Sequence, residues 1–210
     1  DDLPEVIYAR EYDAAISPNG NIPVHAFNLI SPTFFANSST GNKYSLWVNV
    51  YGVSERYLNV YGEKDLRAQM NQFFHRTYTH PVDGTTLDMK MLCNWYWYDE
   101  TAILETGKGT KDWNFYRYAE TLLSAAEAIA QSSGVNAEAA GYLAQVKARA
   151  NMEGKDVSTI ASELQRLGKQ AFIEECWKER LREFPLEMKI WDDCVRTGKF
   201  LSLIHISEPT

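Results

Sequence analysis

The sequence predicts a mainly α-helical protein, in which a loop-rich region with short strands, residues 1–112, precedes a helical region, residues 113–200. Three observations predict this fold class. Apolar residues recur every three or four positions along 118–129, which is the period of one helix face. Gly134 and Asn136 then provide a helix stop and a helix start. Before residue 112, short β-branched and aromatic runs alternate with segments rich in Gly, Pro, Asn and Ser.

The first region is interpreted as strands joined by loops and short helices. Strands are expected at Val6–Tyr12, Arg76–His80 and Leu92–Tyr98, while Tyr44–Tyr51 fits a strand or a loop. The segment 54–70 predicts one or two short helices, interrupted at Gly62. In the strand at Leu92–Tyr98, alternation would place two tryptophans on one face and two tyrosines on the other. A strand with aromatic side chains on both faces is usually covered on both, so these four residues are expected in the core.

The second region predicts helices over 114–132, 137–151 and 159–184, followed by a short helix over 186–195. The first two are joined by a short connection and must therefore pack antiparallel. Pro185 ends the third, because proline disfavours helical backbone at the residue before it. The hairpin of the first two helices resembles a tetratricopeptide unit. Such a unit cannot bury its own apolar stripe, so further helices should pack against it.

Composition narrows the functional classes. The chain has 28 acidic and 21 basic residues, a balance that argues against a nucleic-acid surface, which needs clustered Lys and Arg. Cys93, Cys176 and Cys194 are widely spaced and odd in number, which predicts neither a disulfide framework nor a zinc site. Cys176 and Cys194 are interpreted as small buried apolar side chains. There is no nucleotide-binding loop and no nucleophile motif, so no cofactor and no metal are expected.

Two carboxylate doublets are the residues closest to a catalytic set. Asp99–Glu100 and Asp192–Asp193 suggest glycoside hydrolysis, which needs two carboxylates facing each other across the sugar, about 5–10 Å apart. Adjacent residues on one helix point in different directions, so structural roles are expected for both doublets. His25, His75 and His80 are scattered and lack companions at ligand spacing, which favours core or surface histidines. No catalytic set emerges.

Charged residues near the C-terminal end are expected to stabilise helices. Residues three apart on a helix can pair, and the candidate pairs are Arg117 with Glu120, Arg180 with Glu183, and Glu179 with Arg182. Together with Asp193 and Arg196, the last two pairs predict a polar network that joins the final helices.

Aromatic residues in the loops are the remaining functional signal. Sugars present flat C–H faces that stack on aromatic rings, while their hydroxyls bind Asn, Asp and Arg. The candidate ligand-binding residues lie in polar, turn-rich loops, where a role in the core is less expected. They are Phe34, Phe35, Tyr44, Trp47 and Tyr51. The other tryptophans outside the 92–98 run, Trp113, Trp177 and Trp191, are assigned to helix packing.

The two ends of the chain are interpreted as non-native boundaries. Leu201–Thr210, LSLIHISEPT, resembles a sequencing-library adapter translated in frame, and is expected to contribute no specific packing. The alternative is a genuine apolar C-terminal strand. The chain opens at Asp1 without a Met, a signal region or a lipid-acceptor Cys, which predicts a fragment and leaves localisation open.

Three sequence blocks carry a family resemblance. They are YDETAILETGKGTKDWNFYRYAETLL at 98–123, YLAQVKARA at 142–150 and ERLREFPLEMKIWDDCVRTGK at 179–199. In this order they resemble the C-terminal part of the SusD/RagB family, the surface lipoproteins of Bacteroidetes outer membranes. The chain departs from the family at Glu187-Met188 and Ile190, where Glu-Gly and an Arg before the Trp are usual.

The resemblance implies a SusD-like fold and a non-catalytic function. It implies that residues 1–200 form the C-terminal part of a SusD/RagB-like domain, with 201–210 a non-native tail. It further implies surface binding of an oligosaccharide and its handover to a SusC-like TonB-dependent transporter in the outer membrane. Attachment to the membrane would then use only an N-terminal lipid anchor that precedes this fragment.

Two other functions remain open at this point, a helical-repeat scaffold for protein interaction and a glycoside hydrolase. Loop aromatics exposed together on one face would favour glycan binding. An apolar groove lined by the helical hairpin, with buried loop aromatics, would favour the scaffold. A carboxylate pair facing across an aromatic cleft would favour the hydrolase.

Overall fold

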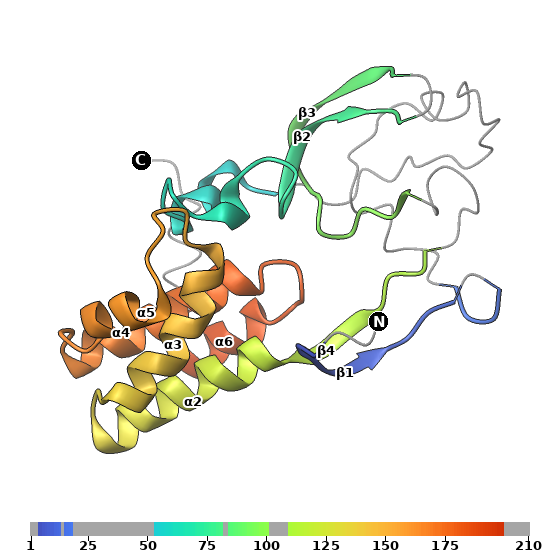
Figure 1. Cartoon of the computed structure of the whole chain (residues 1–210). Coiled ribbons are helices and arrows are strands. Elements are labelled where there is room, and N and C mark those ends of the chain that lie inside the picture. Colours follow the sequence, from blue (N-terminus) through green and yellow to red (C-terminus); the bar gives the residue numbers. More distant parts are fainter. Residues whose placement is uncertain (1–3, 14, 19–52, 82–83, 101–108, 200–210) are drawn as a thin grey trace. The chain divides into compact units, whose positions relative to one another are not determined.

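A computed structural model describes residues 4–13, 15–18, 53–81, 84–100 and 109–199. The chain forms two compact units, the first mainly 9–58 and 67–114, the second 2–8, 59–66 and 115–210. The elements, in chain order, are β1 (Val6–Arg10), the 3-10 helices η2 (Glu55–Val60) and η3 (Leu66–Ala68), β2 (Phe74–Thr79), β3 (Thr86–Asn94), β4 (Trp113–Arg117), α2 (Tyr118–Ser133), α3 (Ala137–Ala150), α4 (Val157–Leu164), α5 (Lys169–Glu183) and α6 (Ile190–Thr197) (Figure 1). The mainly helical class is confirmed.

The first unit is built on the antiparallel hairpin of β2 and β3. Its register pairs Phe74 with Asn94 and Tyr78 with Leu87, with an irregularity between His75 and Thr77. Phe74, His75 and Tyr78 are buried on this hairpin. The predicted strand at Arg76–His80 lies almost entirely within β2, and the predicted helices around Gly62 are η2 and η3.

The predicted strand at Leu92–Tyr98 is wrong in its second half. β3 ends at Asn94, and the four aromatic residues that follow turn away from the ladder, with the Tyr98 amide donating to the Trp95 carbonyl at 2.9 Å. Tertiary packing explains the turn. The centroid of the Trp95 ring lies 4.7 Å from that of His75 and 4.1 Å from that of Tyr98. The Trp97 ring stacks on Trp113 with 5.1 Å between centroids. Trp97 is only 5% exposed and the other three are half-buried, so the turn serves mainly as core.

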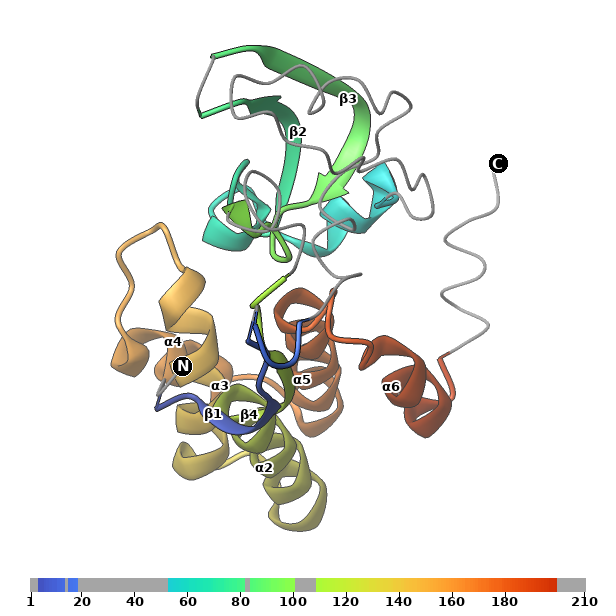
Figure 2. The same cartoon turned by 90° about the vertical axis from the view of Figure 1, so that its right-hand side faces the viewer.

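The second unit is a bundle around the α2–α3 hairpin. α2 and α3 run side by side in opposite directions (Figure 1 and Figure 2), as predicted from their short connection. Gly134 ends α2 with a φ of 83°, a backbone conformation that favours glycine. Asn136 starts α3, because its side chain accepts a hydrogen bond from the Ala139 amide at 2.9 Å. α5 packs on α2 and α4 packs on α3, so both helices cover apolar faces of the hairpin.

The core of this unit combines alanines with larger apolar side chains. Small residues at the contacts let the helices approach closely. The buried members are Ala119, Leu122, Leu123, Ala126, Ala130, Ala139, Ala140, Leu143, Ala144, Val146, Ile160, Leu164, Phe172, Cys176 and Phe184. Cys176 and Cys194 are 0% and 2% exposed, which confirms them as buried small side chains.

The predicted helix over 159–184 is wrong, because two helices occupy it. α4 ends at Leu164 and α5 begins after Gly168, whose extended backbone (φ −66°, ψ 156°) interrupts the helical path. α4 also starts earlier than predicted, since Asp156 caps it by accepting from the Thr159 amide at 2.8 Å. The break lets α4 and α5 pack on different helices of the hairpin.

The bounds of the first and last helices of this region also differ from the predicted ones. The predicted helix over 114–132 begins instead at Tyr118, because the residues before it form β4, which pairs with β1. The last helix is α6 at Ile190–Thr197, shifted from 186–195. Met188 adopts a φ of 57° in the turn before it, which no helix contains.

Among the described residues, no helix has both the length and the hydrophobicity needed to cross a bilayer. The segments Tyr44–Tyr51 and Leu201–Thr210 lie outside the described residues, so the expectations for them stay predictions.

Candidate functional site

The five predicted ligand-binding residues, Phe34, Phe35, Tyr44, Trp47 and Tyr51, all lie outside the described residues. Within the part of the chain that the structure describes, five other aromatic side chains are exposed to 40% or more. They are Tyr8, Phe115, Tyr116, Tyr118 and Trp191. The first four are gathered at β1, β4 and the first residue of α2, and we call these four the ribbon surface.

The ribbon surface presents rings on both faces of a two-stranded sheet. Tyr8 of β1 stacks on Phe115 of β4, with ring centroids 5.4 Å apart and an angle of 26° between the planes. Phe115 and Tyr116 are adjacent in a strand and therefore project to opposite faces. On the Tyr116 side, the Lys189 ammonium lies 4.7 Å from the ring centroid. Phe115, Tyr116 and Tyr118 were not predicted as candidate ligand-binding residues, because the sequence pattern predicts a helix over 114–132. The signal available was the aromatic Trp113–Tyr116 run, which favours a strand.

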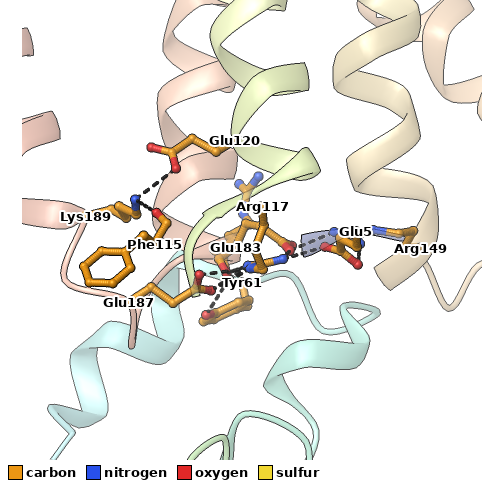
Figure 3. A network of polar contacts seen from close by, with 10 residues as sticks. Glu5, Tyr61, Phe115, Arg117, Glu120, Arg149, Glu183, Glu187 and Lys189 are labelled. Carbon is orange, nitrogen blue, oxygen red and sulfur yellow. Dashed lines mark hydrogen bonds and ion pairs between the residues drawn. The ribbon is translucent and has the colours of Figure 1, made fainter. Parts of the chain in front are cut away.

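Arg117, the last residue of β4, anchors the two-stranded sheet to the helices beside it. Its guanidinium binds three carboxylates from other elements (Figure 3), with Nη2 2.5 Å from Glu187 Oε1, and Nη1 3.0 Å from Glu183 Oε1 and 2.6 Å from Glu5 Oε1. The Arg117 Cζ also lies 4.9 Å from the Phe184 ring centroid. Arg117, Glu183 and Glu187 are all less than 9% exposed, so this is a buried ion network.

Charge in the network is shared between two arginines and three glutamates. Arg149 adds contacts of 2.7 Å to both Glu5 and Glu183. Burial alone would raise the pKa of Glu5, but hydrogen bonds and charge from Arg149 and Arg117 outweigh it and lower that pKa. Burial raises the pKa of Glu187 against the opposing effect of Arg117. The network therefore holds β4, α3, α5 and the residue before β1 to one another.

Lys189 fixes the other side of the ribbon. Its ammonium donates to the Phe115 carbonyl at 2.5 Å and lies 2.9 Å from Glu120 Oε2 (Figure 3). The same ammonium lies over the Tyr116 ring. It therefore holds the Phe115 backbone, the Glu120 carboxylate and the Tyr116 ring together. Aromatic rings on a scaffold fixed in this way lose little conformational entropy on binding a ligand.

The predicted polar network between the last helices is confirmed. Arg182 lies 2.9 Å from Glu179, Arg180 lies 2.7 Å from Asp193, and Arg196 lies 3.1 Å from Asp193. Glu120 was predicted to pair with Arg117, and Glu183 with Arg180, but both have partners on more distant elements. Glu120 binds Arg180 and Lys189, and Glu183 binds Arg117 and Arg149.

One residue of each acidic doublet has structural contacts. Asp99 accepts hydrogen bonds from the Thr110 amide and hydroxyl at 2.8 and 3.3 Å, while Asp193 is paired with arginines. His75 and His80 are buried, and His25 lies outside the described residues. Over the described ranges, no group of three or more His, Cys, Asp or Glu side chains is placed to hold a metal ion.

A groove of about 470 Å³ lies along the helical hairpin. Its floor includes Leu122 of α2 and Val146 of α3, while Tyr118 and Val157 line it and are 48% and 39% exposed. Glu5 and Arg149, 2.7 Å apart, also line it. This is the apolar hairpin groove that would favour an interaction scaffold, although the burial of the loop aromatics, the other half of that expectation, falls outside the described residues.

Comparison with known proteins identifies the family. The model of the SusD family matches residues 34–203. A SusD superfamily protein from Parabacteroides distasonis is 23% identical, with a TM-score of 0.71 over 91% of this chain and 39% of that chain. Surface glycan-binding protein A from Bacteroides thetaiotaomicron, solved in complex with laminarihexaose, is 19% identical, with a TM-score of 0.64 over 95% of this chain and 44% of that chain.

A second surface glycan-binding protein A, from Bacteroides uniformis, is 21% identical, with a TM-score of 0.63 over 94% of this chain and 38% of that chain. The chain thus spans about two fifths of the length of the solved structures it resembles. A comparison with curated proteins gives no match. Identities this low show a shared fold.

Proposed function

This chain belongs to the SusD family, and from that premise we propose that it binds glycan nutrients without cleaving them. The binding protein would act at the surface of the outer membrane and hand its ligand to a TonB-dependent transporter. The observation that carries the proposal is the ribbon surface, where four exposed aromatic side chains gather on a scaffold fixed by buried charge.

The chemistry of the ribbon suits a sugar. A pyranose presents a flat C–H face, which packs on the exposed side of a ring such as Tyr8 or Phe115. Its hydroxyls need donors and acceptors close to the rings. The Tyr8 hydroxyl is of this kind on the Phe115 face, and the Tyr116 hydroxyl and Lys189 are of this kind on the opposite face. The loop residues Phe34, Phe35, Tyr44, Trp47 and Tyr51 remain proposed ligand-binding residues in their own right.

The non-catalytic part of the proposal rests on how the carboxylates are used. Hydrolysis of a glycoside needs an acid and a second carboxylate on either side of the bond. Glu183 and Glu187 are buried against Arg117, Asp193 against Arg180, and Asp99 binds Thr110. Each of these four carboxylates is thus held by an arginine or by Thr110, which fits a structural role. We also propose that the chain forms the C-terminal part of a longer SusD-like domain, held at the membrane by a lipid anchor elsewhere in that protein.

The test is a glycan-binding measurement with the whole chain. Calorimetric titration with a panel of oligosaccharides, laminarihexaose, maltohexaose, cellohexaose and xylohexaose, should give saturable binding of at least one. The double variant Tyr8→Ala, Phe115→Ala should weaken it, whereas Ile16→Ala, which removes a side chain 88% exposed in the first unit, should not. Chromatography after incubation should return the oligosaccharide intact. Shortened products, or binding that ignores the ribbon variant, would contradict the proposal.

An interaction scaffold is the second candidate, and the hairpin groove favours it. Its apolar floor and polar rim suit a peptide segment that inserts apolar side chains. Val157→Asp would place a charge in this groove. Loss of a bound protein partner in this variant, from a chain that binds no oligosaccharide of the panel, would favour the scaffold over glycan binding.

A further inference from the structure

The Asp192–Asp193 doublet is divided between two environments. Asp193 is 4% exposed and accepts from Arg180 Nε at 2.8 and 2.7 Å. Asp192 is exposed, and no contact joins its carboxylate to another of the described residues. It lines a groove of about 400 Å³ formed with residues of α2 and α5. One carboxylate of the doublet thus stabilises the fold, while the other faces open space.

The wall of this groove is a fixed array of planar polar groups. Glu127 Oε1 accepts from Gln131 Nε2 at 2.9 Å and from Arg196 Nη1 at 2.6 Å. Arg180 donates to the Ser124 hydroxyl at 3.3 Å, and Arg196 to Asp193 at 3.1 Å. These contacts hold the groups in place while leaving further hydrogen-bonding capacity, because each guanidinium has five N–H donors and each carboxylate about four lone-pair sites. The two arginines nearly balance the three carboxylates, so the groove is polar with little net charge.

An exposed tryptophan stands beside the groove. Trp191 is 62% exposed, which overturns its assignment to helix packing. Successive helix residues are rotated by about 100°, so Trp191 lies next to the side of α6 that carries Asp192 and Arg196. Val195, four residues further along the helix and 61% exposed, extends the apolar surface on the Trp191 side.

We propose that this groove and Trp191 form a second carbohydrate-binding site, distinct from the ribbon surface, which takes one end or one branch of a neutral glycan. For its ligand class this inference rests on the proposed function. The indole packs on a sugar C–H face, and the planar carboxylate, guanidinium and amide groups bind pairs of neighbouring hydroxyls. The groove volume falls within the range of ligand sites, roughly 300–1,000 Å³.

The polar wall of the groove argues against a protein as the ligand of this site. The buried cores of protein interfaces are depleted of charged residues, whereas Glu127, Asp192 and Arg196 line this groove. A cationic ligand is also disfavoured, since Glu127 and Asp193 are already neutralised by arginine. A neutral polyol needs hydrogen bonds and a flat apolar surface, and the groove with Trp191 supplies both.

The test follows the indole N–H of Trp191 by NMR in the whole chain, with the resonance assigned by its loss in Trp191→Phe. The probes are laminarihexaose, maltohexaose, cellohexaose and xylohexaose. We expect at least one to shift this resonance saturably. At this site Trp191→Ala should reduce affinity roughly five-fold or more, by analogy with stacking on aromatic rings. Asp192→Asn should weaken it as well, while Val195→Ala, on the same exposed side but without a ring, should leave it unchanged.

The two glycan proposals fail in different ways. Binding that depends on Tyr8 and Phe115 while the Trp191 resonance stays unmoved would overturn this inference and leave the proposed function standing. Binding of no probe would contradict both. A change of oligomeric state in Trp191→Ala and Val195→Ala, measured by sedimentation, would assign α6 to a protein interface and would also overturn the inference. Unchanged far-UV circular dichroism is the control for folding.

Discussion

Arg117 and Glu187 are 70 residues apart in the chain, yet their side chains form a buried ion pair with Nη2 2.5 Å from Oε1. The pair joins the end of β4 to the turn between α5 and α6. It therefore fixes the strand that carries Phe115 and Tyr116 relative to the helices. Both partners are less than 9% exposed, so each charge depends on the other for compensation.

Replacing Arg117 should test this relationship. Arg117→Met keeps an apolar stem but leaves Glu187 buried without its guanidinium, which should reduce the free energy of unfolding by about 3–5 kcal/mol. The measurement is urea denaturation. Arg76→Met is the control, because Arg76 and Glu55 form an exposed pair, whose loss should cost less than about 1 kcal/mol. Equal losses in the two variants would show that burial of the network has no energetic consequence.

Glu175 should make stability depend on pH at the acid end. Burial tends to raise its pKa, but Lys147 and Arg182, the latter 2.9 Å away, outweigh burial and lower it. A carboxyl whose folded pKa is lowered contributes stability above its unfolded pKa, about 4.3, and this contribution is lost as pH falls through the folded pKa. Glu175→Gln should therefore be less stable than the parent by roughly 1–3 kcal/mol at pH 7. The difference should shrink at about pH 3 and below. A difference that is constant from pH 7 to pH 3 would exclude this cause.

The cap at the start of α3 should account for a measurable share of stability. Asn136 accepts from the Ala139 amide at 2.9 Å, and Asn136→Ala removes that acceptor. The expected loss in thermal or urea denaturation is about 1 kcal/mol. Asn136→Asp retains a capping oxygen and should restore most of the loss. A variant with alanine as stable as the parent would mean that water or the backbone replaces the cap.

Replacing Trp47 should affect ligand binding but not folding stability. If its ring is a stacking platform, Trp47→Ala should weaken oligosaccharide binding by about 1–3 kcal/mol, the magnitude of base stacking on aromatic side chains. Stability should change little, because an exposed ring contributes little to the core. Calorimetry and denaturation on the same sample check both. Unchanged affinity together with a large loss of stability would make Trp47 a core residue.

Much of the helical unit could be predicted from the sequence because its signals are local. The apolar period of 118–129, the stop at Gly134 and the cap at Asn136 lie within single turns of the helices they define, and α2 and α3 follow them closely. The polar contacts among Glu179, Arg180, Arg182, Asp193 and Arg196 were predicted for a similar reason, since most of these residues lie on one helix or its neighbour in sequence. The family resemblance also came from short blocks in a fixed order, and the family match confirms it. The proposed loop residues around Trp47 stay a prediction.

Tertiary structure decided the features that depend on residues distant in sequence. Residues 113–117 form a strand because β1, about a hundred residues earlier, pairs with them, and this pairing overrides a helical continuation of α2. The helix predicted over 159–184 is broken before Gly168 so that its halves can pack on different helices. Arg117 has carboxylate partners up to 112 residues away, and Trp191, which the sequence pattern assigned to helix packing, is 62% exposed in the folded chain. Periodicity and capping are encoded within a few residues, whereas strand pairing, charge compensation and the exposure of a ring are set by which segments the folded chain brings together.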